Sequence, residues 1–295
     1  MQELVKKYVE LKNETLAYVE VGSGDKTIVL IHGNYSSSIH YYPFLTNCPK
    51  GYKIYAFDLR GFGDSSYNNS FNTIDELALD IIEAFETLNI KDINLVGWSL
   101  GGAVSLKIAA KRQDLVRKLV LIEGASHRGF PVFEKDEKYQ NIYGHIYPSK
   151  EAMAKDPVLV VPALQGFKAQ DRVFFDIIYM ATMWNKKRPA EDEVAVYITE
   201  TMKERCLVDT DWALANFNMS DASNLYNLGD GDIKDVKCPT LITLATEDLV
   251  VTEEMIMTNV NAIEGSTLKV YEHAGHSLIT DIPELLLNDI VEFIK

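Results

Sequence analysis

Short runs of apolar, largely β-branched residues, separated by helical patterns, constrain the fold of this chain more than any other feature. Residues 27–31 read Thr-Ile-Val-Leu-Ile, and comparable runs occupy 54–57, 93–96 and 119–122. Such runs are typical of strands that are buried on both faces of a sheet, where neither face reaches water. Helical patterns lie between them, so the alternation predicts a parallel, doubly wound α/β sheet.

The clearest predicted helix begins after Thr73. Thr73 and Glu76 have the spacing of a capping box, in which the two side chains satisfy backbone N–H groups at the start of a helix. An apolar stripe at helical spacing follows, formed by Ile74, Leu77, Ile81, Phe85 and Leu88. A second helix is predicted from about Leu100 to Arg112.

The strand-helix alternation stops after Glu123. Residues 126–230 contain helical segments and loops but no clear buried strand. We therefore predict one α/β core, formed by 1–125 and 231–295, with residues 126–230 as a helical cap insertion.

The alternation resumes at Pro239. A strand at 240–244, a helix at 252–263 and a strand at 268–271 are predicted, and a last helix begins near Pro283. These elements would complete the sheet after the insertion.

Ser99 is the main candidate for a catalytic residue. It lies in the run Gly97-Trp98-Ser99-Leu100-Gly101, between a predicted buried strand and a predicted helix. This is the context of the G-x-S-x-G nucleophile elbow, a sharp turn that needs small residues beside the serine. The N-terminus of the following helix favours developing negative charge. We therefore predict that Ser99 is a nucleophile.

A serine hydroxyl is a weak nucleophile and needs a base within hydrogen-bond reach. His276 follows the last predicted strand, which places it at the same edge of the sheet as Ser99. We predict that His276 is the base, and we interpret its neighbour His273 as a structural residue.

The base needs a carboxylate that fixes its tautomer. Asp248 follows the strand at 240–244, and the order Ser99, Asp248, His276 is the order expected for a nucleophile elbow of this type. Glu123 ends the strand at 119–122 and is the alternative acid. Two backbone donors for the oxyanion are predicted, the N–H groups of Leu100 and Asn34.

Charge and composition limit the partners of the chain. It has 43 acidic and 29 basic residues among 295, a net charge of −14. This charge repels nucleic acid and anionic membrane surfaces, so we expect neither as a partner. The first residues lack the apolar segment of a secretory signal and no apolar run is long enough to span a bilayer, so we expect a cytoplasmic protein. The three widely spaced cysteines suit neither a disulfide framework nor a zinc site, and we expect no metal and no cofactor.

Together these motifs resemble the α/β-hydrolase superfamily over nearly the whole chain. His32-Gly33 follows the third strand, residues 58–65 (Asp-Leu-Arg-Gly-Phe-Gly-Asp-Ser) are similar to its D-x-R-G-x-G-x-S turn, and Ala274-Gly275-His276 is similar to its histidine loop. The resemblance implies a mostly parallel eight-stranded sheet flanked by helices, with a helical cap over the site. It also implies that Asp58 and Arg60 form a turn and are not catalytic.

Several branches of this superfamily share part of the pattern. The sequence around Ser99 is similar to that of small carboxylesterases, whereas the His-Gly-Asn run at 32–34 resembles haloalkane dehalogenases. Those enzymes need an aspartate nucleophile followed by tryptophan, and this chain has Ser99 and Leu100, so halide displacement is not predicted. Carbon–carbon bond hydrolases share the Ser-Asp-His set but usually carry a Gly-Pro-Gly-rich oxyanion loop. Arg172 or Arg188 in the cap would offer them a partner for a substrate carboxylate.

We therefore predict a small-molecule substrate, a small or medium carboxylic ester. A carbon–carbon bond hydrolase, a lactonase or a perhydrolase are the alternatives, and a non-catalytic binding relative is disfavoured because all three triad candidates are present. The predicted substrate contacts are Trp98, Tyr35, Met180 and Trp184.

Overall fold

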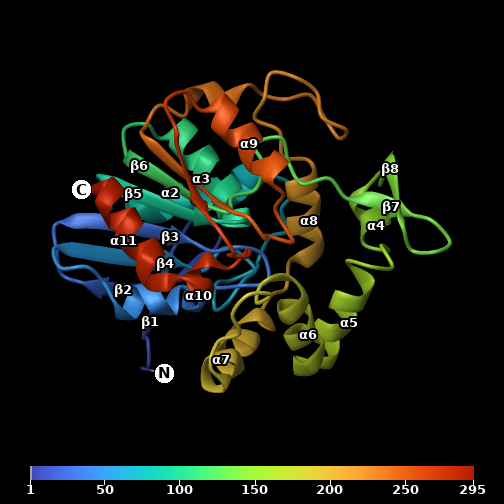
Figure 1. Cartoon of the computed structure of the whole chain (residues 1–295), viewed down its shortest axis with the longest axis horizontal. Helices are drawn as coiled ribbons and strands as arrows, with labels where there is room; N and C mark the ends of the chain where they lie inside the picture. The colour runs from blue at the N-terminus through green and yellow to red at the C-terminus, as the bar shows by residue number, and fades with distance from the viewer. Residues whose placement is uncertain (1) are drawn as a thin grey trace.

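An eight-stranded sheet runs through the computed structural model, which describes residues 2–295 (Figure 1). The strand order is β1-β2-β4-β3-β5-β6-β9-β10. The strands are β1 (Lys6–Glu10), β2 (Thr15–Gly22), β3 (Lys26–Ile31), β4 (Tyr52–Phe57), β5 (Ile93–Trp98), β6 (Val116–Ile122), β9 (Thr240–Ala245) and β10 (Thr267–Tyr271). Only the pairs β1–β2 and β2–β4 are antiparallel. The predicted, mostly parallel eight-stranded sheet is confirmed.

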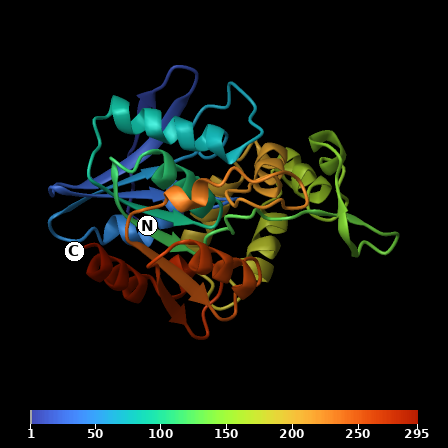
Figure 2. The same ribbon diagram turned by 90° about the horizontal axis from the view of Figure 1, so that it is seen from above.

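Helices cover both faces of this sheet, as Figure 2 shows for α2 and α11. One face carries α2 (Ile74–Thr87), α3 (Leu100–Lys111) and α9 (Glu253–Ala262). The other carries α1 (Tyr42–Thr46), α10 (Leu278–Asp281) and α11 (Pro283–Ile294). Successive side chains of β3 alternate between the faces, so that Val29 packs with the first set and Leu30 with the second. Both faces are therefore apolar, which explains the uninterrupted apolar runs of the central strands.

The local signals for helix starts are also confirmed. The Glu76 carboxylate accepts a hydrogen bond from the N–H of Thr73, at 3.0 Å, and α2 begins at the next residue. Pro283 is the first residue of α11, where its missing N–H leaves no helical hydrogen bond unmade.

Residues 126–230, here called the cap segment, connect β6 to β9 and lie outside the sheet (Figure 1). Its helices are α4 (Lys150–Met153), α5 (Val161–Ala169), α6 (Arg172–Thr182), α7 (Glu191–Thr201) and α8 (Leu207–Ala215). Part of the segment has its own apolar cluster, which includes Met153, Val160 and Leu207. Side chains of α6 and α7 join the core on the α11 side of the sheet. No helix among residues 2–295 is long and apolar enough to cross a membrane.

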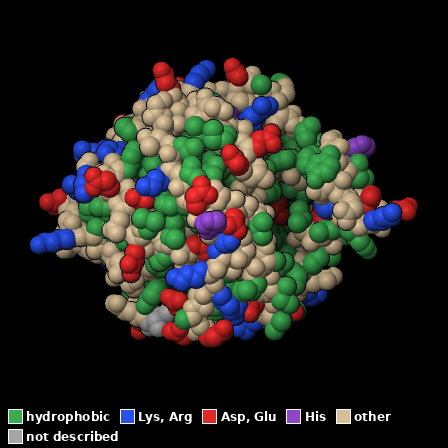
Figure 3. Space-filling model, in the orientation of Figure 1, with side chains coloured by type: hydrophobic (Ala, Val, Ile, Leu, Met, Phe, Trp, Pro, Cys, Tyr) green, Lys and Arg blue, Asp and Glu red, His purple; other side chains and the backbone are tan. Residues whose placement is uncertain are grey.

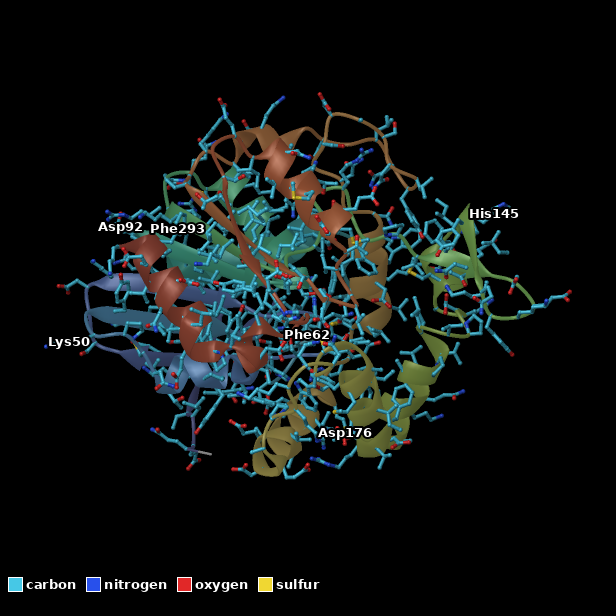
Figure 4. The ribbon with its side chains drawn as sticks, in the orientation of Figure 1. Lys50, Phe62, Asp92, His145, Asp176 and Phe293 are labelled. Atoms are coloured by element: carbon cyan, nitrogen blue, oxygen red, sulfur yellow. The ribbon has the colours of Figure 1, made fainter. Side chains whose placement is uncertain are left out.

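The cap segment also contains a β-hairpin that the sequence patterns did not indicate. Strands β7 (Phe133–Lys135) and β8 (Asn141–Ile146) pair in antiparallel fashion and project from the molecule. None of their residues is fully buried, and most of β8 is exposed, so no burial imposes an apolar alternation on the sequence. His145 lies on this hairpin, far from the sheet edge, as its label in Figure 4 shows.

Candidate active site

Ser99 lies at a sharp turn between β5 and α3. Its backbone has φ 55° and ψ −117°, in the region where a non-glycine residue is strained. A Cβ at Gly97 would lie 2.2 Å from the carbonyl oxygen of Gly101, so the strand and the new helix approach too closely for a side chain there. The turn therefore has the geometry expected of a nucleophile elbow, and Ser99 lines a cavity.

His276 and Asp248 form a buried hydrogen-bonded pair. The Nδ1 of His276 lies 2.7 Å from the Oδ2 of Asp248, and both side chains are almost fully excluded from solvent. The other oxygen of Asp248 accepts the N–H groups of Val250 and Val251, at 2.6 and 3.0 Å. These contacts fix the carboxylate, so Nδ1 of the neutral ring carries the proton and Nε2 has a free lone pair.

The Nε2 atom of His276 is buried and has no hydrogen-bond partner among residues 2–295. Trp98, the residue before Ser99, donates its indole N–H to the carbonyl oxygen of His276, at 3.0 Å. This hydrogen bond connects the loop that carries His276 to the nucleophile elbow at Ser99. A buried basic nitrogen without a partner is the atom that a general base requires.

Glu123 occupies a different environment from Asp248. It is buried, and its carboxyl oxygens accept the Thr243 hydroxyl at 2.7 Å and the Ala245 N–H at 3.1 Å. Burial and the neighbouring Asp248 carboxylate raise the pKa of Glu123 well above its ordinary value. The acid that the structure brings to His276 is Asp248. His273 is 87% exposed and pairs with Glu247, away from the triad candidates.

The loop after β3 lies directly against Ser99. A Cβ at Gly33 would be 3.0 Å from the Cβ of Ser99. The N–H of Leu100 is at the first position of α3, where no helical acceptor exists. This placement is compatible with the predicted oxyanion donors, Leu100 and Asn34, which remain a prediction.

The turn at residues 58–65 holds the N-terminal strand and the loops together. The two oxygens of Asp58 accept the N–H groups of Ser38 and Asp64, at 2.8 and 2.9 Å. Arg60 forms a bidentate pair with Asp80, with both distances 2.7 Å. These are structural contacts, as the sequence motif indicates.

A mostly apolar cavity of about 260 Å³ opens beside Ser99. Figure 3 shows a hollow on this face of the molecule, bordered by hydrophobic side chains and with acidic atoms in its depth. The cap segment supplies much of the apolar wall, through Phe174, Ile178, Tyr179 and Met183. Because a helix repeats every 3.6 residues, α6 presents Phe174, Ile178 and Tyr179 to the cavity from one side, and Met183 follows directly after its end.

Only one of the four predicted substrate contacts, Tyr35, lines this cavity. Trp98 is packed in the core beneath the elbow, and Trp184 packs against Tyr179 with ring centroids 4.5 Å apart. Met180 follows Tyr179 by one residue, which turns it toward solvent with 43% of its surface exposed. The structure therefore does not place these three residues at the cavity. For Met180 the reason is that tertiary packing decides which face of a cap helix meets the cavity.

The two cap arginines do not line the cavity either. Arg188 pairs with Asp176, which is labelled in Figure 4, and Arg172 donates to Thr199 at 2.8 Å. Both contacts lie on an exposed part of the cap segment. The structure therefore does not place these arginines at the cavity beside Ser99, where a substrate carboxylate would lie.

Sequence reasoning missed two carboxyl groups at the loop after β3, the partly exposed Asp211 and the buried Glu204. Asp211, on α8, lines the cavity, and its Oδ1 accepts the side-chain amide of Asn34 at 3.3 Å. Glu204 is 4% exposed and its Oε2 accepts the N–H of Tyr35 at 3.2 Å. No local motif marks either residue, because neither follows a strand of the sheet.

Comparisons with known proteins bear on the family and the fold of the chain. A protein-family model, described as the alpha/beta hydrolase family, matches residues 28–288. The (E)-2-((N-methylformamido)methylene)succinate hydrolase of Acinetobacter baylyi is 25% identical over 289 residues, which are 95% of each chain. The 2-hydroxy-6-oxo-6-(2'-aminophenyl)hexa-2,4-dienoic acid hydrolase of Metapseudomonas resinovorans is 25% identical and covers 99% of this chain and 91% of its own. The solved esterase EaEST of Exiguobacterium antarcticum superposes with a TM-score of 0.74 at 20% identity, covering 98% of this chain and 99% of its own.

Proposed function

Since the chain belongs to the alpha/beta hydrolase family, we propose that it is a serine hydrolase that cleaves small or medium carboxylic esters through an acyl-enzyme on Ser99. The observation that carries the proposal is the 2.7 Å contact between His276 and Asp248, which leaves the buried Nε2 of His276 without a partner. Such a nitrogen is suited to accept the proton of a serine hydroxyl.

In the first half of the reaction, Ser99 Oγ attacks the acyl carbon and His276 Nε2 takes its proton. The carbonyl oxygen becomes an oxyanion, which the N–H groups of Leu100 and Asn34 stabilise. The tetrahedral intermediate then collapses. The ester C–O bond breaks, and the leaving alcohol takes the proton from His276.

In the second half, His276 removes a proton from water, and the hydroxide attacks the acyl carbon. The second tetrahedral intermediate releases the carboxylic acid, and Ser99 regains its proton from His276. Asp248 holds the ring and stabilises the imidazolium in both halves without taking up a proton. These steps need no metal and no cofactor.

The cavity supports an ester as the substrate. Its walls are mostly apolar and its volume, about 260 Å³, suits a small molecule. The two relatives named above act on a succinate and on a dienoic acid, and the cavity of this chain has no lysine, arginine or histidine among its described lining residues. We therefore do not transfer those acidic substrates to this chain. A small-molecule substrate, a cytoplasmic location and the absence of nucleic acid and membrane partners remain part of the proposal.

The proposal is tested with a fluorophosphonate probe and with 4-nitrophenyl acetate and butyrate. We expect the wild-type protein to be labelled and to hydrolyse the esters, and Ser99→Ala to lose labelling and at least about a thousandfold in kcat. Ser105→Ala is the matched control, because Ser105 is buried in α3 and its hydroxyl has no partner among residues 2–295. Labelling that persists in Ser99→Ala would overturn the nucleophile. Turnover of vinylogous diketone acids without ester hydrolysis would assign carbon–carbon bond cleavage instead.

A further inference from the structure

We propose that Asp211 makes the cavity a site for substrates that carry an ammonium group, in preference to neutral or carboxylate-bearing molecules of the same size. The identity of the reacting bond rests on the proposed function. The charge preference is a property of the cavity and can be measured without any reaction.

Asp211 is the one charged side chain among the described residues that line the cavity. Its neighbours on the cavity wall are mostly apolar, including Leu214 on its own helix and Val132 and Phe174 on the cap segment. Ser99 lines the same cavity, so a molecule that contacts Asp211 also reaches toward the proposed nucleophile.

The carboxyl group of Asp211 is only partly satisfied. Its Oδ1 accepts the Asn34 side-chain amide at 3.3 Å, a long hydrogen bond from a neutral donor. Within residues 2–295 its Oδ2 accepts no hydrogen bond and no lysine or arginine lies within ion-pair distance. The side chain is partly exposed to the cavity, so this oxygen is open to a hydrogen-bond donor that a ligand would bring.

Three other titratable groups face Asp211. They come from the loop after β3, the loop before α5 and the loop before α8, and are Tyr35, Asp156 and Glu204. Burial raises the pKa of Tyr35 and of Glu204, which favours their neutral forms, so the negative charge near Asp211 comes from Asp156, whose pKa burial would raise but its hydrogen bonds lower. Asp156 is itself paired with Lys135, at 2.8 Å. Burial and the Asp156 carboxylate raise the pKa of Asp211 to about 7, against the opposing hydrogen bond from Asn34.

An ammonium ion in the cavity would supply the missing partner. It donates a charge-assisted hydrogen bond to Oδ2, which is stronger than a bond between neutral groups, and it lowers the pKa of Asp211. A carboxylate would meet like charge in an apolar cavity, and one of the two acids would have to take up a proton. The cavity should therefore rank ligands as ammonium, then neutral, then carboxylate.

The test is calorimetric binding of hexylammonium, hexanol and hexanoate at pH 8. In the wild-type protein we expect hexylammonium to bind at least about tenfold more tightly than hexanol, and hexanoate to bind most weakly. Asp211→Asn keeps the size of the side chain and should remove the difference between hexylammonium and hexanol. Glu264→Gln is the control, because this exposed residue follows α9 at the opposite edge of the sheet, and it should keep the wild-type ranking.

Equal affinities for hexylammonium and hexanol in the wild-type protein would overturn the proposal, and so would an unchanged preference in Asp211→Asn. If Asp211→Asn does not fold, the wild-type protein at pH 5.5 serves instead. There Asp211 is protonated, so the preference for hexylammonium should shrink, and an undiminished preference would assign it to another group.

The fluorophosphonate experiment separates this proposal from the proposed function. If the wild-type protein is not labelled at Ser99 but still prefers hexylammonium, only the hydrolase mechanism is refuted. Normal labelling with equal affinities would refute the ammonium site alone. As a catalytic readout, the 4-nitrophenyl ester of 6-aminohexanoic acid should show a higher kcat/KM than the heptanoate ester, and this advantage should disappear in Asp211→Asn.

Discussion

Two carboxyl groups, those of Glu123 and Asp248, follow the adjacent parallel strands β6 and β9 at the edge where Ser99 lies, and their surroundings separate their roles. Asp248 accepts two backbone N–H groups on one oxygen and contacts His276 with the other. Glu123 is buried beside Asp248 with a raised pKa, because burial and the adjacent negative charge both disfavour a second carboxylate. The raised pKa favours the protonated form of Glu123, which supports Asp248 without adding a second negative charge beside the histidine.

This difference predicts unequal effects of two isosteric substitutions. Asp248→Asn should lower kcat for 4-nitrophenyl butyrate by about 10³- to 10⁴-fold, because the amide stabilises neither the correct tautomer nor the imidazolium. Glu123→Gln should stay within about tenfold of the wild-type kcat, because an uncharged amide resembles a protonated carboxyl. A larger loss in Glu123→Gln than in Asp248→Asn would make Glu123 the catalytic acid.

Residues that follow strands of the sheet are predictable from sequence, whereas residues that face a cavity from the cap are not. Ser99, Asp248 and His276 each lie just after an apolar run, and a parallel sheet brings all such positions to one edge. Asp211 and Met180 lie on cap helices. Whether either side chain meets the cavity depends on how those helices pack, which no periodicity in the sequence encodes.

At the scale of elements, the same physics explains what the sequence patterns indicated and what they missed. The central strands and α2 bury their side chains, so burial imposes a readable pattern on them. The β7–β8 hairpin buries little, and its strands therefore lack a pattern. Turn residues leave a signal too, as the Asp58 and Arg60 contacts show.

A buried lysine joins three elements that are distant in sequence. Lys6 on β1 lies 2.7 Å from Asp58 in the 58–65 turn and 2.9 Å from Glu200 on α7. Although burial alone would lower it, these two carboxylates raise the pKa of Lys6. The ion pairs therefore connect the cap segment to the edge of the sheet.

Removal of this cation should destabilise the fold. We expect Lys6→Met to lower the free energy of unfolding by about 3–5 kcal/mol, because the fully buried Asp58 carboxylate loses its cation, whereas Glu200 keeps its ion pair with Lys203. Lys7→Met is the adjacent control. Lys7 is half-exposed and pairs with Glu20, so its loss should cost no more than about 1 kcal/mol. Urea unfolding at pH 7 measures both, and equal shifts in the two variants would contradict a structural role for the Lys6 contacts.

At the scale of the whole molecule, buried titratable groups act on stability with opposite signs. Burial lowers the pKa of His32 to about 4 and that of His40 to about 3, so these rings stay neutral in the fold and favour unfolding as the pH falls below about 6.5. Burial raises the pKa of Glu123 and Glu204, so these groups hold a proton in the fold that they release on unfolding. The contribution of these two groups to the free energy of unfolding is present in full at low pH and is lost as the pH rises.

Glu204→Gln isolates one of these contributions. The ordinary pKa of a glutamate is about 4.5. Well below that pH, Glu204 is protonated in both the folded and the unfolded protein, so it adds no pH dependence to the free energy of unfolding. Above that pH the unfolded chain releases the proton while the folded chain retains it, so the wild-type protein loses stability by up to about 1.4 kcal/mol per pH unit until the folded group also ionises. The amide of Gln does not titrate. The free energy of unfolding of Glu204→Gln, minus that of the wild-type protein, should therefore increase from pH 5 to pH 7 in urea titrations, whereas the same difference for the exposed Glu264→Gln should change little. If the difference for Glu204→Gln does not change with pH, the folded protein carries an ionised Glu204 beside the Tyr35 backbone. The negative charge around Asp211 would then be larger than the raised pKa of Glu204 implies.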